Sequence, residues 1–223
     1  MEERKGGNKA EQAAEALLAW IVAERLAPGD RIPREEELEE QLGVGRSTVR
    51  EAVKLLASRN ILEVRQGAGT FLSPKQGVTE DPLGFVLVQD KRKLAEDLLE
   101  LRLILEPPIA ALAAERALPE DCRQLNRWRQ EVEGQIGRGE NHLQADAAFH
   151  AEIARLSGNG AVSRLLPVIT QSVELDGEVT EMRLGRETVE THREICRAIE
   201  EKNPRKAWEA MYLHLQLNRR GMR

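Results

Sequence analysis

The sequence has few aromatic residues, two cysteines and no long apolar run. Aromatic residues are only 3% of the 223 residues, a share too low for an all-β sandwich or barrel. Cys122 and Cys196 lack CxxC spacing and cannot form a disulfide framework. No stretch approaches the roughly 18 consecutive apolar residues of a transmembrane helix. Residues 1–7 are charged with no apolar segment behind them, so no secretory signal is expected and cytoplasmic residence is the simplest prediction.

The chain also lacks the net positive charge that is usual for a nucleic-acid-binding domain. Its net charge is −5, from 33 basic and 38 acidic residues. This charge is unevenly distributed, because residues 45–66 hold five basic and two acidic side chains, whereas residues 34–42 hold five glutamates. One face of an acidic protein can therefore be positive, although a pair of solvated surface helices would give the same pattern.

Apolar spacing and turn signals predict a mostly α-helical chain in two domains. Helical spacing covers residues 9–26, 33–42 and 47–59, and a short β-hairpin is predicted from residues 61–65 and 70–72. From residue 91 onward the pattern favours an antiparallel all-α bundle of about six helices, with breaks near residues 119, 137–141, 158–160, 176–177 and 203–204. We therefore expect an N-terminal domain over residues 1–75, a linker over 76–90 and a helical domain over 91–223.

Two helices joined by a tight turn and followed by a hairpin are typical of a winged helix-turn-helix domain. The second helix of this motif enters the major groove with its N-terminal residues towards the base edges. Arginine can bind guanine through two hydrogen bonds, and serine or threonine can reach bases or phosphates. The candidate DNA-contacting residues are therefore Arg46, Ser47, Thr48 and Arg50, with Gly67 and Gly69 at the tip of the wing. A helical hairpin with a surface arginine cluster is the alternative.

Three stretches of this half resemble the GntR family of bacterial transcription regulators. They are LAPGDRIP at 26–33, LGVGRSTVREA at 42–52 and GAGTFL at 67–72, within a match from residue 13 to 73. The resemblance implies a homodimer that binds a pseudo-palindromic double-stranded DNA operator, with contacts from the four residues of 46–50 named above and from Gly67. One position departs from the family pattern. Glu36 stands where members often have a phosphate-binding arginine, and Arg34 is the residue that can compensate.

The C-terminal half places histidines within the apolar stripes of its predicted helices. Asp146 and His150 are four residues apart on one helix. His192 lies eleven residues before Asn203 and His214 eleven residues after it, so a helical hairpin that turns there brings both imidazoles to one level. Three imidazoles and a carboxylate inside a bundle predict a divalent metal site, whereas three separately satisfied core histidines are the alternative. His142 falls outside the stripe and is expected to be exposed.

The same half resembles the FCD domain of the FadR-like branch of the GntR family. The resemblance rests on DLLELRLILE at 97–106, Asp146-x3-His150, SGN at 157–159 and the segments around His192 and His214. It implies a metal held by those four residues and a small organic acid bound nearby. Zinc is the favoured ion, with nickel, manganese and iron as alternatives. Arg102 matches an effector-facing arginine and could clamp a carboxylate, although a surface pair with Glu106 fits its spacing equally.

These observations predict a DNA-binding transcription regulator rather than an enzyme. A small carboxylate effector bound at the metal would control its affinity for the operator, with repression or activation set by the position of that operator. A metal-dependent hydrolase or lyase with a DNA-binding appendage is the rival, but no HExxH motif or free general base accompanies the histidines. A regulator with a purely structural metal is the third possibility.

Overall fold

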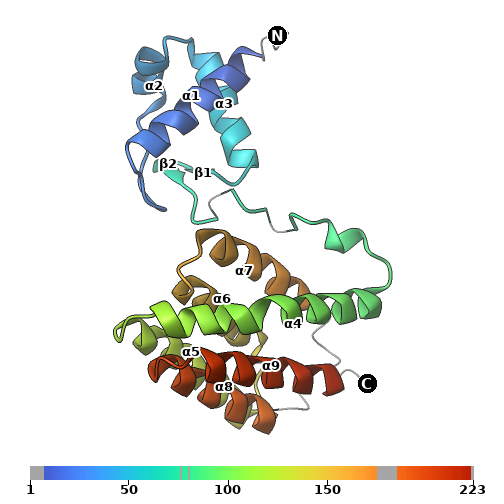
Figure 1. Ribbon diagram of the computed structural model, residues 1–223. Helices are drawn as coiled ribbons and strands as arrows, with labels where there is room; N and C mark the ends of the chain where they lie inside the picture. Colours follow the sequence, from blue (N-terminus) through green and yellow to red (C-terminus); the bar gives the residue numbers. More distant parts are fainter. Residues whose placement is uncertain (1–7, 76, 80, 175–184, 222–223) are drawn as a thin grey trace, which may run out of the picture. The chain divides into compact units, whose positions relative to one another are not determined.

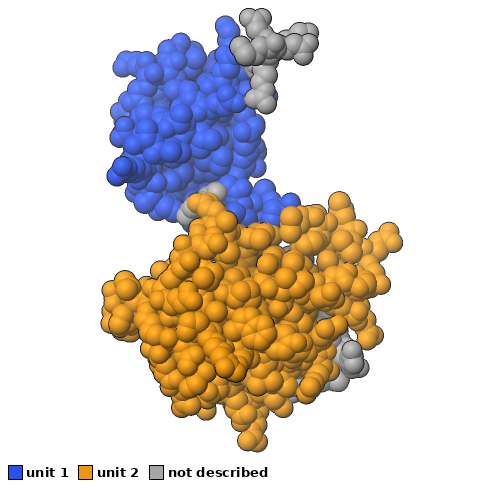
Figure 2. Space-filling view, in the orientation of Figure 1, with its two compact units in different colours: residues 1–82 blue, residues 83–223 orange. Residues whose placement is uncertain are grey.

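The computed structural model describes residues 8–75, 77–79, 81–174 and 185–221, with side chains of residues 171–174 left aside. It divides into two compact units, Met1–Pro82 and Leu83–Arg223, which are coloured separately in Figure 2. The division falls inside the linker that the sequence predicts. Within the described ranges, no helix is both long and apolar enough to cross a membrane.

The first unit contains three helices and a two-stranded antiparallel sheet among its described residues (Figure 1): α1 (Lys9–Ala23), α2 (Glu35–Leu42), α3 (Arg46–Ser58), β1 (Leu62–Arg65) and β2 (Gly69–Leu72). The α1 helix starts at a capping box in which Asn8 and Glu11 satisfy each other's backbone amides. The α2 helix ends at Gly43, whose φ of 64° favours glycine. It begins at Glu35, two residues later than the predicted start at Pro33, and Arg34 is its N-cap residue.

The apolar faces of these helices enclose a small core, against which the hairpin packs. Leu17, Leu38 and Leu56 are almost fully buried, one from each helix. The hairpin pairs Leu62 with Leu72, and Arg31 forms an additional bridge to Phe71. This is the winged helix-turn-helix that the sequence predicts, with α3 as the second helix of the motif and the β1–β2 turn as the wing.

The second unit is a bundle of α-helices. After a short 3-10 helix, η1 (Phe85–Leu87), the described residues form α4 (Lys91–Arg116), α5 (Asp121–Arg138), α6 (Leu143–Leu156), α7 (Gly160–Glu174), α8 (Gly185–Glu200) and α9 (Pro204–Gly221), as Figure 1 shows. The helices end near the predicted breaks, except that the break at Asp176–Gly177 lies outside the described residues. Side chains of Asn159 and Asn203 accept hydrogen bonds from the first turns of α7 and α9, as expected for N-caps.

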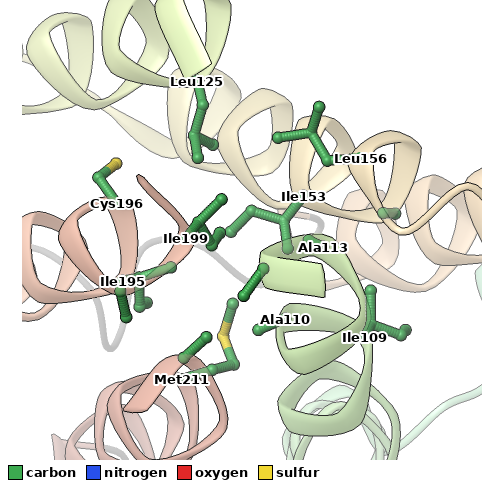
Figure 3. Packing of buried hydrophobic residues seen from close by; sticks show 14 of the residues in the cluster. Ile109, Ala110, Ala113, Leu125, Ile153, Leu156, Ile195, Cys196, Ile199 and Met211 are labelled. Carbon is green, nitrogen blue, oxygen red and sulfur yellow. The ribbon is translucent and has the colours of Figure 1, made fainter. Parts of the chain in front are cut away.

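All six described α-helices of the bundle contribute to its apolar core, part of which Figure 3 shows. Alanines of α4, including Ala110 and Ala113, let neighbouring side chains approach closely, and Ile153 of α6, Ile199 of α8 and Met211 of α9 fill the space between them. Because interiors are closely packed, this core fixes the registers of α4, α6, α8 and α9 against one another. The polar side chains described next project from the same four helices.

One sequence prediction about α6 was wrong. His142 was expected to be exposed, but only 3% of its surface is accessible. The stripe predicted for this helix was Leu143, Ala147, Ile153 and Ala154. Ile153 and Ala154 are buried, but Leu143 and Ala147 are only partly buried, and the buried face also contains Ala145 and Phe149. His142 precedes Asp146 by one helical turn and therefore shares that buried face.

Candidate metal centre and nucleic-acid interface

The N-terminal half of α3 presents the predicted DNA-contacting residues to solvent. Arg46, Ser47 and Arg50 are exposed and Thr48 is partly buried, while Val49 between them enters the core. Gly45 precedes the helix and supplies no side-chain cap, so the first α3 amides are available to a phosphate. Gly67, at the tip of the wing, is also exposed and has a φ of 73°.

A carboxylate on α2 connects two of these residues. Glu35 Oε2 accepts hydrogen bonds from Nε of Arg50 at 2.8 Å and from Nε of Arg46 at 3.4 Å. The hydrogen bond from Arg50 is the main reason that the pKa of Glu35 is lowered, so the carboxylate is ionised when it bridges the two arginines. Arg34 and Glu36 are exposed. Glu35 carries no sequence signal for this contact, because the contact spans the turn between the two helices.

In the second unit, four side chains from three helices converge. Asp146 and His150 come from α6, His192 from α8 and His214 from α9, and one potential ligand atom from each lies within 4.8 Å of every other. The ring centroids of His192 and His214 are 4.7 Å apart, which is the juxtaposition that their spacing around Asn203 predicts. All four residues are buried, with at most 5% of their surface accessible.

Several polar atoms of this cluster have no hydrogen-bond partner among the described residues. They include Asp146 Oδ1 and the Nε2 atoms of His150 and His192. These atoms lie close together without pairing: His192 Nε2 is 3.2 Å and His150 Nε2 is 3.6 Å from an oxygen of Asp146. Buried polar atoms without partners are costly, and a cation placed among them would satisfy all of them.

The protonation states of the cluster suit metal binding. Burial alone would raise the pKa of Asp146, but His150 and His192 hold it well below its ordinary value. Burial lowers the pKa of His192 and that of His214, the latter well below its ordinary value. These directions favour an ionised Asp146 and neutral His192 and His214, the states in which these groups act as ligands. The set fits a divalent metal with open positions, and three nitrogens with one oxygen suit zinc, nickel, manganese or iron.

Each of the three imidazoles has a different neighbour that orients its ring. Nδ1 of His150 lies 2.5 Å from Glu106 Oε2 of α4, a close polar contact in which neither atom has a hydrogen-bond partner in the described structure. Nδ1 of His214 lies 3.0 Å from the hydroxyl of Thr191, which also contacts backbone carbonyls of α8. Nδ1 of His192 has no hydrogen-bond partner in the described structure, but its ring stacks on Phe149 with centroids 4.1 Å apart. Such supports orient ligands and fix their tautomers.

Arg102 is buried, as the effector-facing prediction requires, and also pairs with Glu106, as the alternative proposed. Only 2% of Arg102 is accessible, and its Nε lies 2.5 Å from Glu106 Oε1. The pair is therefore internal rather than a surface pair. Burial opposes ionisation of Glu106, but Arg102 and His150 lower its pKa to about 2. The four-residue spacing of Arg102 and Glu106 indicates their pairing, but it does not indicate the contact of Glu106 with His150 on another helix.

Comparisons with known proteins agree with both halves of this structure. The model of the gntR family of bacterial regulatory proteins matches residues 9–72, and the FCD domain model matches residues 97–217. A GntR protein of known structure from Streptococcus agalactiae is 47% identical with a TM-score of 0.87, over 95% of this chain and 99% of that chain.

Characterised relatives point the same way. The HTH-type transcriptional regulator LutR of Bacillus subtilis is 30% identical over 85% of this chain and 90% of its own length. The Uxu operon transcriptional regulator of Escherichia coli is 30% identical over 88% of this chain and 79% of its own length. These relatives are named as transcriptional regulators, not enzymes. With a winged helix-turn-helix, a helical FCD domain and such relatives, the chain belongs to the GntR family and is a DNA-binding transcription regulator of the GntR/FCD type.

Proposed function

We propose that this regulator binds its operator as a homodimer and releases or tightens it in response to a small organic acid. In the DNA-binding half, Arg46 and Arg50 would read bases, Ser47 and Thr48 would contact bases or phosphates, and the backbone at Gly67 would approach the adjacent groove. Arg34, exposed before α2, would supply the phosphate contact that Glu36 cannot make. Two such units related by two-fold symmetry would match a pseudo-palindromic site. The protein would act in the cytoplasm, where the DNA is.

In the FCD half, a divalent metal would be held by Asp146, His150, His192 and His214. The observation that carries this proposal is the convergence of their ligand atoms within 4.8 Å inside the bundle. A metal with open positions would supply a Lewis acid that attracts a carboxylate. Buried Arg102 reaches the same cluster through Glu106 and His150, so its guanidinium adds positive charge near a bound acid. We therefore propose a small carboxylate as the effector.

Linked binding measurements test this function. A panel of organic acids is first screened for an increase in the melting temperature of the zinc-loaded protein. The Kd of the stabilising acid is then measured with and without saturating operator, and the Kd of the operator with and without saturating acid. Because linkage is reciprocal, both ratios must equal the same factor, typically 5 to 150-fold. An acid that binds with the same Kd at all operator concentrations would contradict effector control.

Glu35 should restrain the DNA-reading arginines of the free protein. We expect Glu35→Gln to tighten binding to non-specific duplex DNA about two- to fivefold, because it frees Arg46 and Arg50 from an exposed ion pair worth roughly 0.2–1 kcal/mol. Affinity for the operator should tighten by at least the same factor, since specific contacts engage both arginines and the same ion pair must break first. Fluorescence anisotropy with operator and scrambled duplexes at several salt concentrations measures both effects.

Glu40→Gln is the matched control for this variant, because it removes the same charge from an exposed position of the same helix. An equal gain in non-specific affinity from both substitutions would mean that net charge alone is responsible and that the Glu35 contacts contribute nothing.

A further inference from the structure

Glu106 lies between two groups that the proposed function uses, and it touches both. Its Oε1 lies 2.5 Å from Nε of Arg102, and its Oε2 lies 2.5 Å from Nδ1 of His150. All three side chains are almost fully buried, with 2% or less of each residue accessible. Because bulk solvent does not reach these side chains, the one carboxylate serves both partners.

The 2.5 Å contact to His150, in which neither atom has a hydrogen-bond partner in the described structure, favours one position for the proton of the imidazole. An ionised carboxylate has acceptors only, so the atom facing it must bear hydrogen. Nδ1 of His150 is therefore the protonated nitrogen. In a neutral ring this leaves a lone pair on Nε2, which is the nitrogen that lies 3.6 Å from Asp146 Oδ2 in the cluster. Without this constraint the two tautomers compete, and one of them would direct a proton into the metal site.

We propose that Glu106 is a positioning residue that fixes His150 in its metal-binding tautomer and holds Arg102 beside it. The inference rests on the proposed function for its consequence, but the tautomer itself is a property of the metal-free protein. Glu106 contacts Nδ1 of His150, whereas Nε2 of the same ring faces Asp146, so Glu106 acts through His150. It also links Arg102, the candidate effector residue, to the metal cluster through one shared carboxylate.

Glutamine cannot make both contacts of this carboxylate. The amide of Gln has one acceptor and one donor group, whereas Arg102 Nε and His150 Nδ1 both require an acceptor. The charged guanidinium should take the amide oxygen, which turns the amide NH2 towards Nδ1 of His150. That nitrogen must then accept, so the proton moves to Nε2 and points into the cluster.

The test reads the tautomer and the metal affinity of Glu106→Gln separately. The chain has only four histidines, so 15N-edited spectra of the metal-free protein resolve each ring, and single histidine substitutions assign the signals. We expect His150 to carry its proton on Nδ1 in the wild type and on Nε2 in the variant. Zinc affinity, measured by competition with a chelating dye, should fall about 10- to 100-fold.

Glu152→Gln is the matched control, because Glu152 is also buried and pairs with Arg155 but lies outside the cluster. It should change neither the tautomer of His150 nor the zinc affinity. A Glu106→Gln protein that keeps the proton on Nδ1 and binds zinc like the wild type would overturn the proposal. If instead the wild type binds no zinc but the tautomer still reverses, the metal part of the proposed function fails and the positioning role stands.

Removing one partner of a buried ion pair can prevent folding. The double substitution Arg102→Met/Glu106→Met then provides the test, because apolar residues of similar size usually replace a buried pair without loss of stability. It removes the acceptor from His150 and should also lower zinc affinity about 10- to 100-fold. Wild-type zinc affinity in this folded protein would overturn the proposal.

Discussion

Replacing Asp146 with alanine should abolish most of the stabilisation that a divalent metal gives to the protein. Zinc bound by four ligands contributes about 10–16 kcal/mol, so one ligand accounts for roughly 3 kcal/mol, or on the order of a 100-fold change in Kd. At a zinc concentration about 100 times the wild-type Kd, metal binding adds about 2.7 kcal/mol of stability, against about 0.4 kcal/mol when Kd rises 100-fold.

This loss is measured as the difference in melting temperature with and without zinc. For a chain of this size we expect a shift of roughly 5–10 °C in the wild type and about 1 °C in Asp146→Ala. Glu152→Ala is the control, because it removes a buried carboxylate of the same helix that faces Arg155 instead of the cluster. A full zinc-induced shift in Asp146→Ala would place the metal at other residues.

Removing the metal with a chelator also distinguishes an effector-binding role of the metal from a structural one. If chelation leaves the bundle folded but prevents the acid from stabilising it, the metal acts in effector binding. If chelation unfolds the bundle, the metal is structural, as in the third possibility considered from the sequence. The apolar core around Ile153, Ile199 and Met211 does not include the four ligands, and it should keep the metal-free bundle folded.

The sequence predicted the cluster because helix periodicity is regular over long distances. Asp146 and His150 are one turn apart, and the eleven-residue symmetry about Asn203 requires only that two helices run antiparallel from a common cap. Such arguments depend on the constant rise per residue of an α-helix and on an N-cap residue, which the sequence shows at Asn203. The prediction was wrong for His142, although His142 lies one helical turn before Asp146 and so shares its buried face.

The contacts between helices were beyond the sequence. Glu106 meets His150 because α4 packs on α6, and Glu35 meets Arg46 and Arg50 because α2 packs against α3. These distances depend on how neighbouring side chains interlock, and no periodicity within one helix encodes them. The sequence therefore predicted the four candidate metal ligands but not the residues that orient them.

Phe149→Ala should have the largest effect on folding and a second effect on the metal site. Phe149 is fully buried in α6, and its loss should lower the free energy of unfolding by about 3–5 kcal/mol. Its ring also stacks on His192, whose Nδ1 has no hydrogen-bond partner in the described structure. Stacking is thus the contact that orients this ligand, whereas Glu106 and Thr191 orient the other two imidazoles.

A stacked aromatic pair contributes about 0.5–1.5 kcal/mol beyond burial, so losing it should weaken zinc binding about two- to tenfold. Leu125→Ala provides the comparison, because Leu125 is equally buried in the same core and lies on α5, away from the ligands. Its free energy of unfolding should fall by about 2–5 kcal/mol, but its zinc affinity should stay unchanged. Chemical denaturation of both metal-free proteins and zinc titration of both folded proteins separate the two effects. Equal zinc affinities in the two variants would mean that packing alone, and not the stacked ring, holds His192 in place.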